Sequence, residues 1–248
     1  MEYFMARKVK TTRKQKIFSE IQYSMPQIRE NEANKIIMPR NPSQVDALNY
    51  LRTKTLTILT GPPGTAKTLL STYVACEMLQ KRAIDKIYYV KPIVDVVGEQ
   101  GLGFLPGEVD EKTAPHIAPV RDALSVFMQK GKADYLIDKK IIEFVPLEHL
   151  RGRSLNRCFI IADEMQNAIP HSVLTILTRL GNDSKVALLG DVVQRDLDKK
   201  FGRDGLSDAS KRLSKLGDVG HVEFQFNEII RSGFVRSVIR EYSDLYAA

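Results

Sequence analysis

The sequence predicts an α/β fold in which a mainly parallel sheet is covered by helices on both faces. Two observations indicate this class. Short, continuously apolar runs recur along the chain, and they alternate with longer stretches whose apolar residues follow a helical period. Continuous apolar runs are typical of strands buried on both faces, and strands that alternate with helices form parallel sheets. We therefore expect a three-layer α/β/α sandwich, with ligands at the carboxyl ends of its strands.

The apolar runs and the helical periods divide the chain into elements. The predicted strands are residues 56–59, 86–90, 141–145, 158–162, 186–189 and 219–226. The first predicted helix has Ser43 as its N-cap, and the second follows residue 68. Further helices are predicted over residues 120–129, from 173 to a stop at Gly181, over 206–216 and over 235–245. The stretch 91–120 is rich in glycine and proline, which indicates either a functional loop or a surface hairpin without a role.

The composition is that of a soluble globular protein with unevenly placed charge. The formal net charge is +7, and residues 1–40 hold nine Lys/Arg against four Glu. This basic N-terminal arm indicates either a polyanionic partner or a solvated tail. Cys76 and Cys158 lie inside apolar runs without metal-ligand spacing, which predicts buried thiols and a cytoplasmic location. No apolar stretch approaches the roughly 20 residues of a membrane helix, so we expect no membrane partner.

The strongest functional signal follows the first predicted strand. Eight residues connect that strand to a helical pattern: Gly61, Pro62, Pro63, Gly64, Thr65, Ala66, Lys67 and Thr68. Strand, small-residue loop, Lys-Thr and helix are the order of a P-loop, whose main-chain amides and helix N-terminus bind phosphate. The loop predicts ATP as ligand, with Lys67 on the β- and γ-phosphates and Thr68 on Mg²⁺. The alternative is an ordinary turn between a strand and a helix.

Ala66 departs from the P-loop pattern, which has glycine before the lysine. A residue with a side chain is disfavoured at positive φ, although a methyl group is a small demand. The loop resembles that of minichromosome-maintenance helicases, where alanine also occupies this place. Ala66 is therefore compatible with phosphate binding.

Two acids, Asp163 and Glu164, follow the apolar strand 158–162. A carboxylate pair at the end of a buried strand is typical of the Walker B motif, in which Asp163 would hold Mg²⁺ and Glu164 would orient and deprotonate the attacking water. Two neighbouring acids cost desolvation free energy unless a cation compensates, and Lys67 and Mg²⁺ would do so. The alternative is a strand that simply ends in solvent.

Three further features resemble superfamily 1 helicases. Gly190-Asp191-x-x-Gln194 resembles motif III, which implies that Gln194 contacts the γ-phosphate. Residues 163–166 resemble motif II. Gln44 resembles the adenine-reading glutamine of these helicases, and an amide can pair its donor and acceptor with an adenine edge. The alternative is an exposed glutamine at the start of a helix.

A denser set of short motifs resembles the PhoH-like proteins, the phosphate-starvation-inducible ATPase family. These motifs lie at residues 91–94, 98–99, 102–107, 111–112, 151–156 and 177–181. The resemblance covers the chain from about Asn41 to near its C-terminus and implies a single RecA-like ATPase domain over 41–248, preceded by the arm 1–40. Some relatives carry a PIN nuclease and are linked to RNA unwinding and cleavage. The chain departs from the family at Ala66 and at Lys91, where arginine is expected.

The resemblance implies ATP hydrolysis, for which a cationic finger is still needed. Arg231 resembles a helicase motif IV arginine, and Arg151 and Arg153 are the other candidates. Because 54 residues follow Gln194, too few for a second core, we expect a homo-oligomer, such as a hexameric ring, in which a neighbour supplies the second wall and the finger.

RNA or single-stranded DNA is the expected macromolecular partner, with weaker support. It rests on the basic arm, Lys139-Lys140, the cluster 151–157 and the family resemblance, with Phe104 as a candidate stacking platform. The rival interpretation is a nucleotide-dependent switch or assembly factor that hydrolyses ATP slowly and moves no strand. A small-molecule phosphotransferase is a third class, which nothing in the sequence favours.

Overall fold

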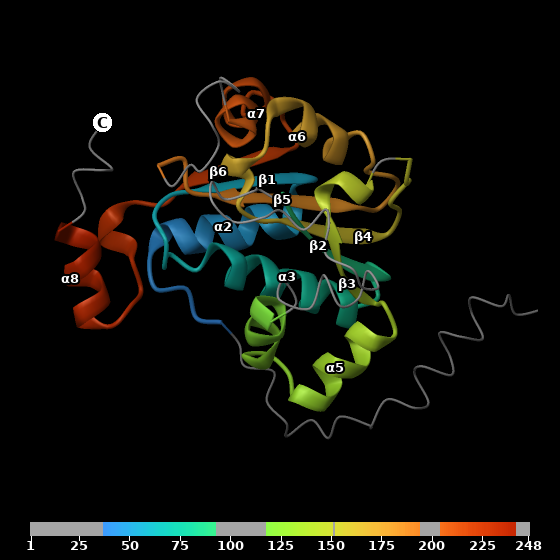
Figure 1. Cartoon of the computed structure of the whole chain (residues 1–248), viewed down its shortest axis with the longest axis horizontal. Helices are drawn as coiled ribbons and strands as arrows, with labels where there is room; N and C mark the ends of the chain where they lie inside the picture. Colours follow the sequence, from blue (N-terminus) through green and yellow to red (C-terminus); the bar gives the residue numbers. More distant parts are fainter. Residues whose placement is uncertain (1–36, 93–117, 151, 194–203, 242–248) are drawn as a thin grey trace, which may run out of the picture. The chain divides into compact units, whose positions relative to one another are not determined.

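The computed structural model describes residues 37–92, 118–150, 152–193 and 204–241 (Figure 1). Several predictions fall outside these residues: most of the arm 1–40, the glycine-rich stretch 93–117 with Phe104, Arg151 and Gln194. The proposed boundary at residue 41 stays a prediction.

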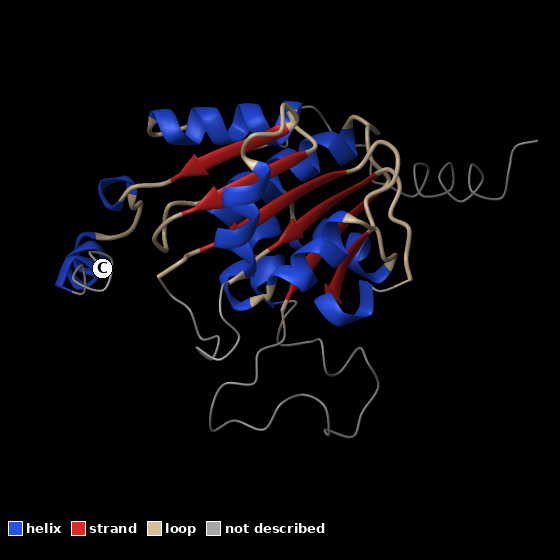
Figure 2. Cartoon of the chain, turned by 90° about the horizontal axis from the view of Figure 1, so that it is seen from above, coloured by secondary structure: helices blue, strands red, loops and turns tan. Residues whose placement is uncertain are grey.

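The predicted parallel sheet is confirmed. Six strands are hydrogen-bonded in the order β3-β2-β4-β5-β1-β6, and every pair is parallel. Figure 2 shows the strands running in one direction, so their carboxyl ends share an edge. The strands are β1 (Leu56–Thr60), β2 (Lys86–Lys91), β3 (Ile142–Pro146), β4 (Cys158–Ala162), β5 (Lys185–Gly190) and β6 (Val219–Glu223).

Helices cover both faces of the sheet, as the three-layer prediction requires. On one face, α2 (Pro42–Thr53) packs against α3 (Lys67–Gln80). The helical residues 118–125 lead to Phe127, whose ring lies 5.5 Å from that of Tyr73 on α3. On the other face, α6 (Pro170–Leu177) packs against α7 (Gly205–Leu213), as Figure 1 shows.

The remaining elements are short or peripheral. They are α5 (Lys130–Asp138), α8 (Gly233–Glu241) and the 3-10 turns η2 (Leu147–Leu150), η3 (Met165–Asn167) and η5 (Phe226–Glu228). None of the helices described is long and apolar enough to cross a lipid bilayer.

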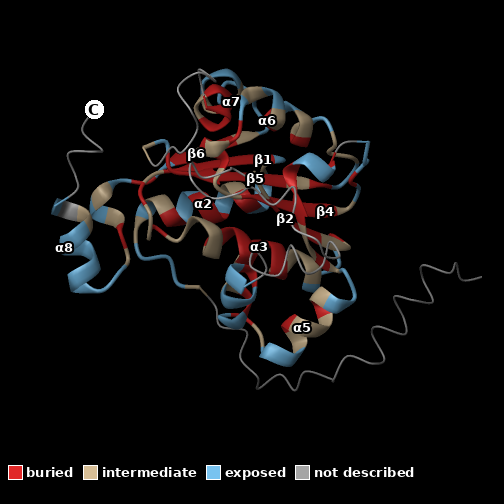
Figure 3. Cartoon of the chain, in the orientation of Figure 1, coloured by how far each residue is buried: buried red, intermediate tan, exposed pale blue. Residues whose placement is uncertain are grey.

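The sheet forms the core of the described fold, because helices exclude water from both faces of the sheet. Every residue of β1 and β4 is buried, and Figure 3 shows the buried residues concentrated in the strands. This two-sided burial explains why the strands read as continuous apolar runs. Cys76 and Cys158 are buried free thiols, as predicted, and burial raises the pKa of Cys76 to about 12.

Several predicted element ends are wrong. Asn41, not Ser43, is the N-cap of α2, since its side chain accepts a hydrogen bond from Gln44 N (2.8 Å), and Pro42 takes the first helical position. Helix α6 ends at Leu177 rather than near Gly181, because Leu180 pairs with Leu155 as an isolated parallel bridge. Helix α5 was not predicted at all.

Candidate functional site

The P-loop connects β1 to α3 and depends on positive φ angles at three of its residues. Gly61 has φ 129° and Gly64 has φ 83°. Ala66, directly before α3, lies in the left-handed region at φ 74° and ψ 21°. Thr65 is fully buried and its hydroxyl donates to Pro62 O at 3.0 Å, which braces the turn. The chain therefore forms a P-loop turn although alanine stands where the pattern has glycine.

The segment after β6 lies directly against this loop. A Cβ atom at Gly61 would collide with the main chain of Phe224, and one at Gly64 would lie 2.8 Å from Arg231 Cγ. A hydrogen bond of 2.8 Å from Ile230 N to Gly64 O fixes the two segments together. The glycines of the loop are thus required by close packing as well as by their backbone angles.

Lys67 lies inside the loop, where its ammonium group donates to Gly61 O at 2.7 Å and Pro62 O at 3.0 Å. Burial lowers the pKa of Lys67, and the nearby carboxylates of Asp191, Asp163 and Glu164 raise it in part. A partly desolvated ammonium at the base of a P-loop has the charge and position needed to bind phosphate oxygens.

Thr68 and Asp163, which are 95 residues apart in the sequence, meet beside the loop. Thr68 Oγ1 donates to Asp163 Oδ2 at 2.8 Å, and Glu164 N donates to Asp163 Oδ1 at 3.0 Å. Burial raises the pKa of Asp163, the charge of Glu164 raises it further, and Lys91 lowers it. A hydroxyl and one carboxylate are oxygen ligands of the kind that Mg²⁺ uses together with substrate phosphates, so these residues fit that ion.

Glu164 has a strained backbone and a carboxylate held at both oxygens. Its φ of 58° and ψ of 35° lie in the left-handed region, which turns the chain from β4 into η3. Gln166 Nε2 donates to Glu164 Oε2 at 2.8 Å, and Lys91 Nζ lies 3.9 Å from Glu164 Oε1. Such strain in a residue with a side chain is concentrated at functional sites.

Gln44 is buried and joins α2 to the P-loop. Its Nε2 donates to Thr65 O at 3.3 Å, and its Oε1 accepts from Arg40 N at 2.9 Å. Both ends of the amide therefore bind main-chain atoms, and contact with an adenine edge requires exchange of at least one of them. The adenine-reading role stays a prediction.

The arginine candidates lie in different places. Arg231 is exposed at the surface, and its side chain lies against Gly64 of its own chain. Arg153 lies 3.5 Å from Glu143 on β3 and 6.0 Å from the centre of the Tyr88 ring on β2. Arg231 therefore borders the P-loop, whereas Arg153 is engaged elsewhere on the sheet.

The other basic residues proposed for nucleic acid lie at the opposite edge. Lys139 and Lys140 lie just before β3, with Ile141 between, and Arg157 directly precedes β4, whereas the P-loop follows β1. Arg157 binds Asp85, with 3.0 Å between Nε and Oδ2. In the described part of the chain, these basic residues therefore do not form one surface with the P-loop.

Sequence reasoning identified the P-loop and the acids but missed their supports. It assigned no site role to Lys91 at the end of β2 or to Gln166 in η3, and it did not expect Phe224 and Ile229 to pack on the loop glycines. The position of Gln166 two residues after Glu164 was visible, but its contact depends on the left-handed turn at Glu164.

Comparison with known proteins adds three findings. The family model described as "PhoH-like protein" matches residues 36–243. The chain is 34% identical over 216 residues to a PhoH-like protein of Bacillus subtilis (strain 168), covering 87% of this chain and 67% of that one. It is 33% identical over 217 residues to Protein PhoH of Escherichia coli (strain K12), covering 87% and 60%. The chain thus spans about three fifths to two thirds of these relatives.

Among solved structures, a similarity was found to the Sulfolobus solfataricus SWI2/SNF2 ATPase core in complex with dsDNA. Its TM-score is 0.42 at 14% sequence identity, and the match covers 79% of this chain and 49% of that chain.

Proposed function

The chain belongs to the PhoH-like family, and we propose that it is a P-loop ATPase that binds Mg-ATP at the carboxyl edge of its sheet and hydrolyses it to ADP and phosphate. One observation carries the proposal. The Thr68–Asp163 hydrogen bond brings the end of the P-loop to the acid pair, as a single phosphate and metal site requires. An ordinary strand-to-helix turn has no need of that contact.

The chain's own residues divide the work. The amides of the P-loop and the N-terminus of α3 bind the phosphates, and Lys67 binds the β- and γ-phosphates. Thr68 and Asp163 would hold Mg²⁺, which supplies neutralising charge to the phosphates. Glu164 accepts a proton from water while the water oxygen bonds to the γ-phosphorus and the bond from that phosphorus to the β–γ bridging oxygen breaks.

Arg231 is the finger that the structure supports best. Its side chain lies against Gly64, so a γ-phosphate held by the loop is close to a cation from the same chain. This proximity favours a finger from the same chain over one supplied by a neighbour. Gln44 as adenine reader remains part of the proposal, and so does Gln194 as γ-phosphate sensor, which lies outside the described residues.

Coupling to RNA or single-stranded DNA, in a homo-oligomer such as a hexameric ring, is the finer part of the proposal. The formal charge of +7 supports a polyanionic partner. Helix α8 begins two residues after Arg231 and exposes Phe234 (78%), Val235 (37%) and Val238 (39%), which Figure 3 shows as a largely exposed helix. An exposed apolar helix face beside the site supports contact with a neighbour.

A nucleotide-dependent switch that moves no strand is the second candidate. Lys139, Lys140 and Arg157 favour it, because they lie at the edge opposite the P-loop and Arg157 is paired with Asp85. Under this alternative ATP binding and slow hydrolysis remain, whereas nucleic acid does not change the rate.

The decisive experiment compares ATP hydrolysis by the full chain and by Glu164→Gln, each with and without RNA and single-stranded DNA. We expect Glu164→Gln to bind Mg-ATP with unchanged affinity but to hydrolyse it about 10²–10⁴-fold more slowly, since only the general base is lost. Stimulation of the unaltered chain by nucleic acid supports the motor, and an unchanged rate supports the switch. If the unaltered chain binds no Mg-ATP, the proposal is wrong.

A further inference from the structure

Gln166 lies at the centre of the site although no role in catalysis has been assigned to it. It is 1% exposed and sits in η3, one turn beyond the acid pair. A buried amide must be hydrogen-bonded at both ends, because an unsatisfied polar group is costly away from water. The hydrogen bonds of its carbonyl oxygen and its amide nitrogen therefore show which segments Gln166 connects.

Hydrogen bonds to Asp191 and Glu164 fix the orientation of the Gln166 amide. Asp191 N can only donate, and it donates to Gln166 Oε1 over 3.1 Å. The Gln166 Nε2 group consequently points the other way and donates to Glu164 Oε2 over 2.8 Å. The side chain thus bridges the main chain at the end of β5 and the carboxylate of the proposed general base.

Gly190 makes this bridge sterically possible. A Cβ atom at Gly190 would overlap Gln166 Oε1 and would lie 2.7 Å from Leu206 Cδ2. The glycine of the Gly190-Asp191 pair is therefore needed so that the amide can approach the end of β5. The left-handed turn at Glu164 completes the geometry by folding η3 back toward β4.

The other contact to Glu164 is a weaker restraint. Lys91 Nζ lies 3.9 Å from Glu164 Oε1, and the two side chains are 33% and 47% exposed. Exposed ion pairs at this distance contribute little, because water screens them and long side chains lose entropy. The hydrogen bond of 2.8 Å from the buried Gln166 amide to this half-exposed carboxylate is shorter and charge-assisted, so Gln166 is the main restraint.

We propose that Gln166 is a positioning residue that holds the Glu164 carboxylate for water activation and ties it to the Gly190–Asp191 end of β5. The inference rests on the proposed ATPase function. Since a general base works only when it is within hydrogen-bond reach of its proton, loss of this restraint lowers turnover. Nucleotide binding depends on the P-loop and is left intact.

Two variants of the full chain test this role by steady-state ATP hydrolysis. Gln166→Leu removes the hydrogen bonds to Asp191 N and Glu164, and Gln166→Glu keeps an acceptor for Asp191 N but removes the donor to Glu164. We expect kcat to fall about 10–100-fold in Gln166→Leu, and at least as far in Gln166→Glu, with KM within about 3-fold of the unaltered value. Ser184→Ala, which loses a buried polar group at the opposite edge, is the control and keeps kcat within about 2-fold.

A double variant separates positioning from general structural damage. In Glu164→Gln the base is already lost, so adding Gln166→Leu should change kcat less than about 2-fold. The inference is overturned by a normal kcat in both Gln166 variants, by a rise in KM that accounts for the whole loss, or by an equal loss in the Glu164→Gln background. If thermal denaturation shows that Gln166→Leu is not folded, the kcat and KM of Gln166→Glu test the inference by the same criteria. No hydrolysis by the unaltered chain overturns the ATPase proposal itself.

Discussion

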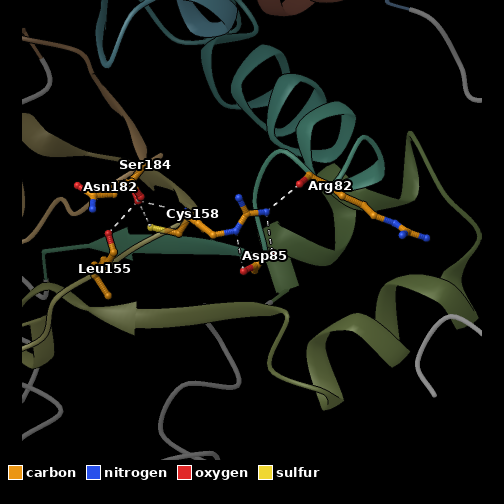
Figure 4. Close-up of polar contacts among 7 residues, drawn as sticks. Arg82, Asp85, Leu155, Cys158, Asn182 and Ser184 are labelled. Carbon is orange, nitrogen blue, oxygen red and sulfur yellow. Dashed lines mark hydrogen bonds and ion pairs between the residues drawn. The ribbon is translucent and has the colours of Figure 1, made fainter. Parts of the chain in front are cut away.

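At the amino edge of the sheet, polar side chains bind one another and the main chain. Ser184 Oγ donates to Leu155 O at 2.8 Å and accepts from Cys158 N at 3.2 Å. Arg157 binds both oxygens of Asp85, at 3.0 and 3.2 Å, and Figure 4 labels Asp85, Ser184, Leu155 and Cys158 in this region. These contacts join the starts of neighbouring strands, so the polar groups of this edge serve the fold.

At the carboxyl edge, charged groups of both signs are gathered, and the ion pair described there, Lys91–Glu164, is long at 3.9 Å. In the part of the chain that the structure describes, Lys67 binds loop carbonyls and forms no ion pair within 4.0 Å. Burial raises the pKa of Asp163 and lowers that of Lys67, so both charged forms are disfavoured where they lie. Groups arranged at a cost to stability are typical of a ligand site. The two edges therefore differ in how their charged groups are held: Arg157 and Asp85 bind each other closely, whereas Lys67 binds main-chain carbonyls.

Strained backbone angles do not distinguish the two edges. Four described residues with positive φ precede strands at the amino edge: Arg82, Lys140, Arg157 and Asp183. Arg82 and Lys140 directly follow the C-caps of α3 and α5, where a left-handed residue is the ordinary way to end a helix. Ala66 and Glu164 instead follow strands, and there the same angle directs main-chain amides and a carboxylate toward the site.

The largest expected effect contrasts two lysines that make similar main-chain contacts at different edges of the sheet. Lys67 and Lys185 both donate to main-chain carbonyls, Lys185 to Lys54 O at 2.6 Å, and burial lowers the pKa of each. We expect Lys67→Ala to reduce ATP hydrolysis about 10³-fold or more and to weaken Mg-ATP binding, since the loop loses its cation. Lys185→Ala should keep the rate within about 2-fold. Equal losses in both variants would show that the edges do not differ in function.

The next effect concerns the arginines. Arg231→Ala should lower kcat about 10²-fold, less than the 10³–10⁵ typical of an arginine finger, because Arg231 is exposed and its charge is screened. Arg153→Ala is the matched control and should leave kcat within about 2-fold. Mixing Arg231→Ala with Lys67→Ala protein tests which chain supplies the finger. Because Arg231 lies against its own P-loop, we expect no recovery of activity in the mixture, and recovery would assign the finger to a neighbour.

The sequence predicted the sheet well because its signals are local. Each strand buried on two faces is a continuous apolar run, and β4 was predicted to the residue as 158–162. The P-loop and the acid pair were equally visible, because spacing along the chain determines where they lie relative to strand ends. Element ends were harder: the Leu155–Leu180 bridge that ends α6 joins segments 25 residues apart.

The supports of the site could not be predicted, because they depend on contacts between distant segments. Arg231 meets Gly64 only after β6 has joined β1, and the Gln166–Asp191 bond requires β4 and β5 to be neighbours. Gln44 resembled an adenine reader in the sequence, but its buried contacts with Thr65 and Arg40 are evident only in three dimensions. Residue type identified the chemistry, whereas packing decided which groups cooperate.

The smallest expected effect is on stability and concerns Ala66. A left-handed angle costs a residue with a Cβ atom roughly 1–2 kcal/mol, and glycine avoids that cost but loses about 0.5–1 kcal/mol of chain entropy on folding. Ala66→Gly should therefore raise the free energy of unfolding by about 0.5–1 kcal/mol, measured by urea denaturation. Arg82→Gly, at a left-handed residue of the amino edge, should gain a similar amount. ATP hydrolysis should stay within about 2-fold in both variants, since the main-chain angles that bind phosphate are kept. A lower rate in Ala66→Gly alone would show that the methyl group itself stiffens the loop for catalysis.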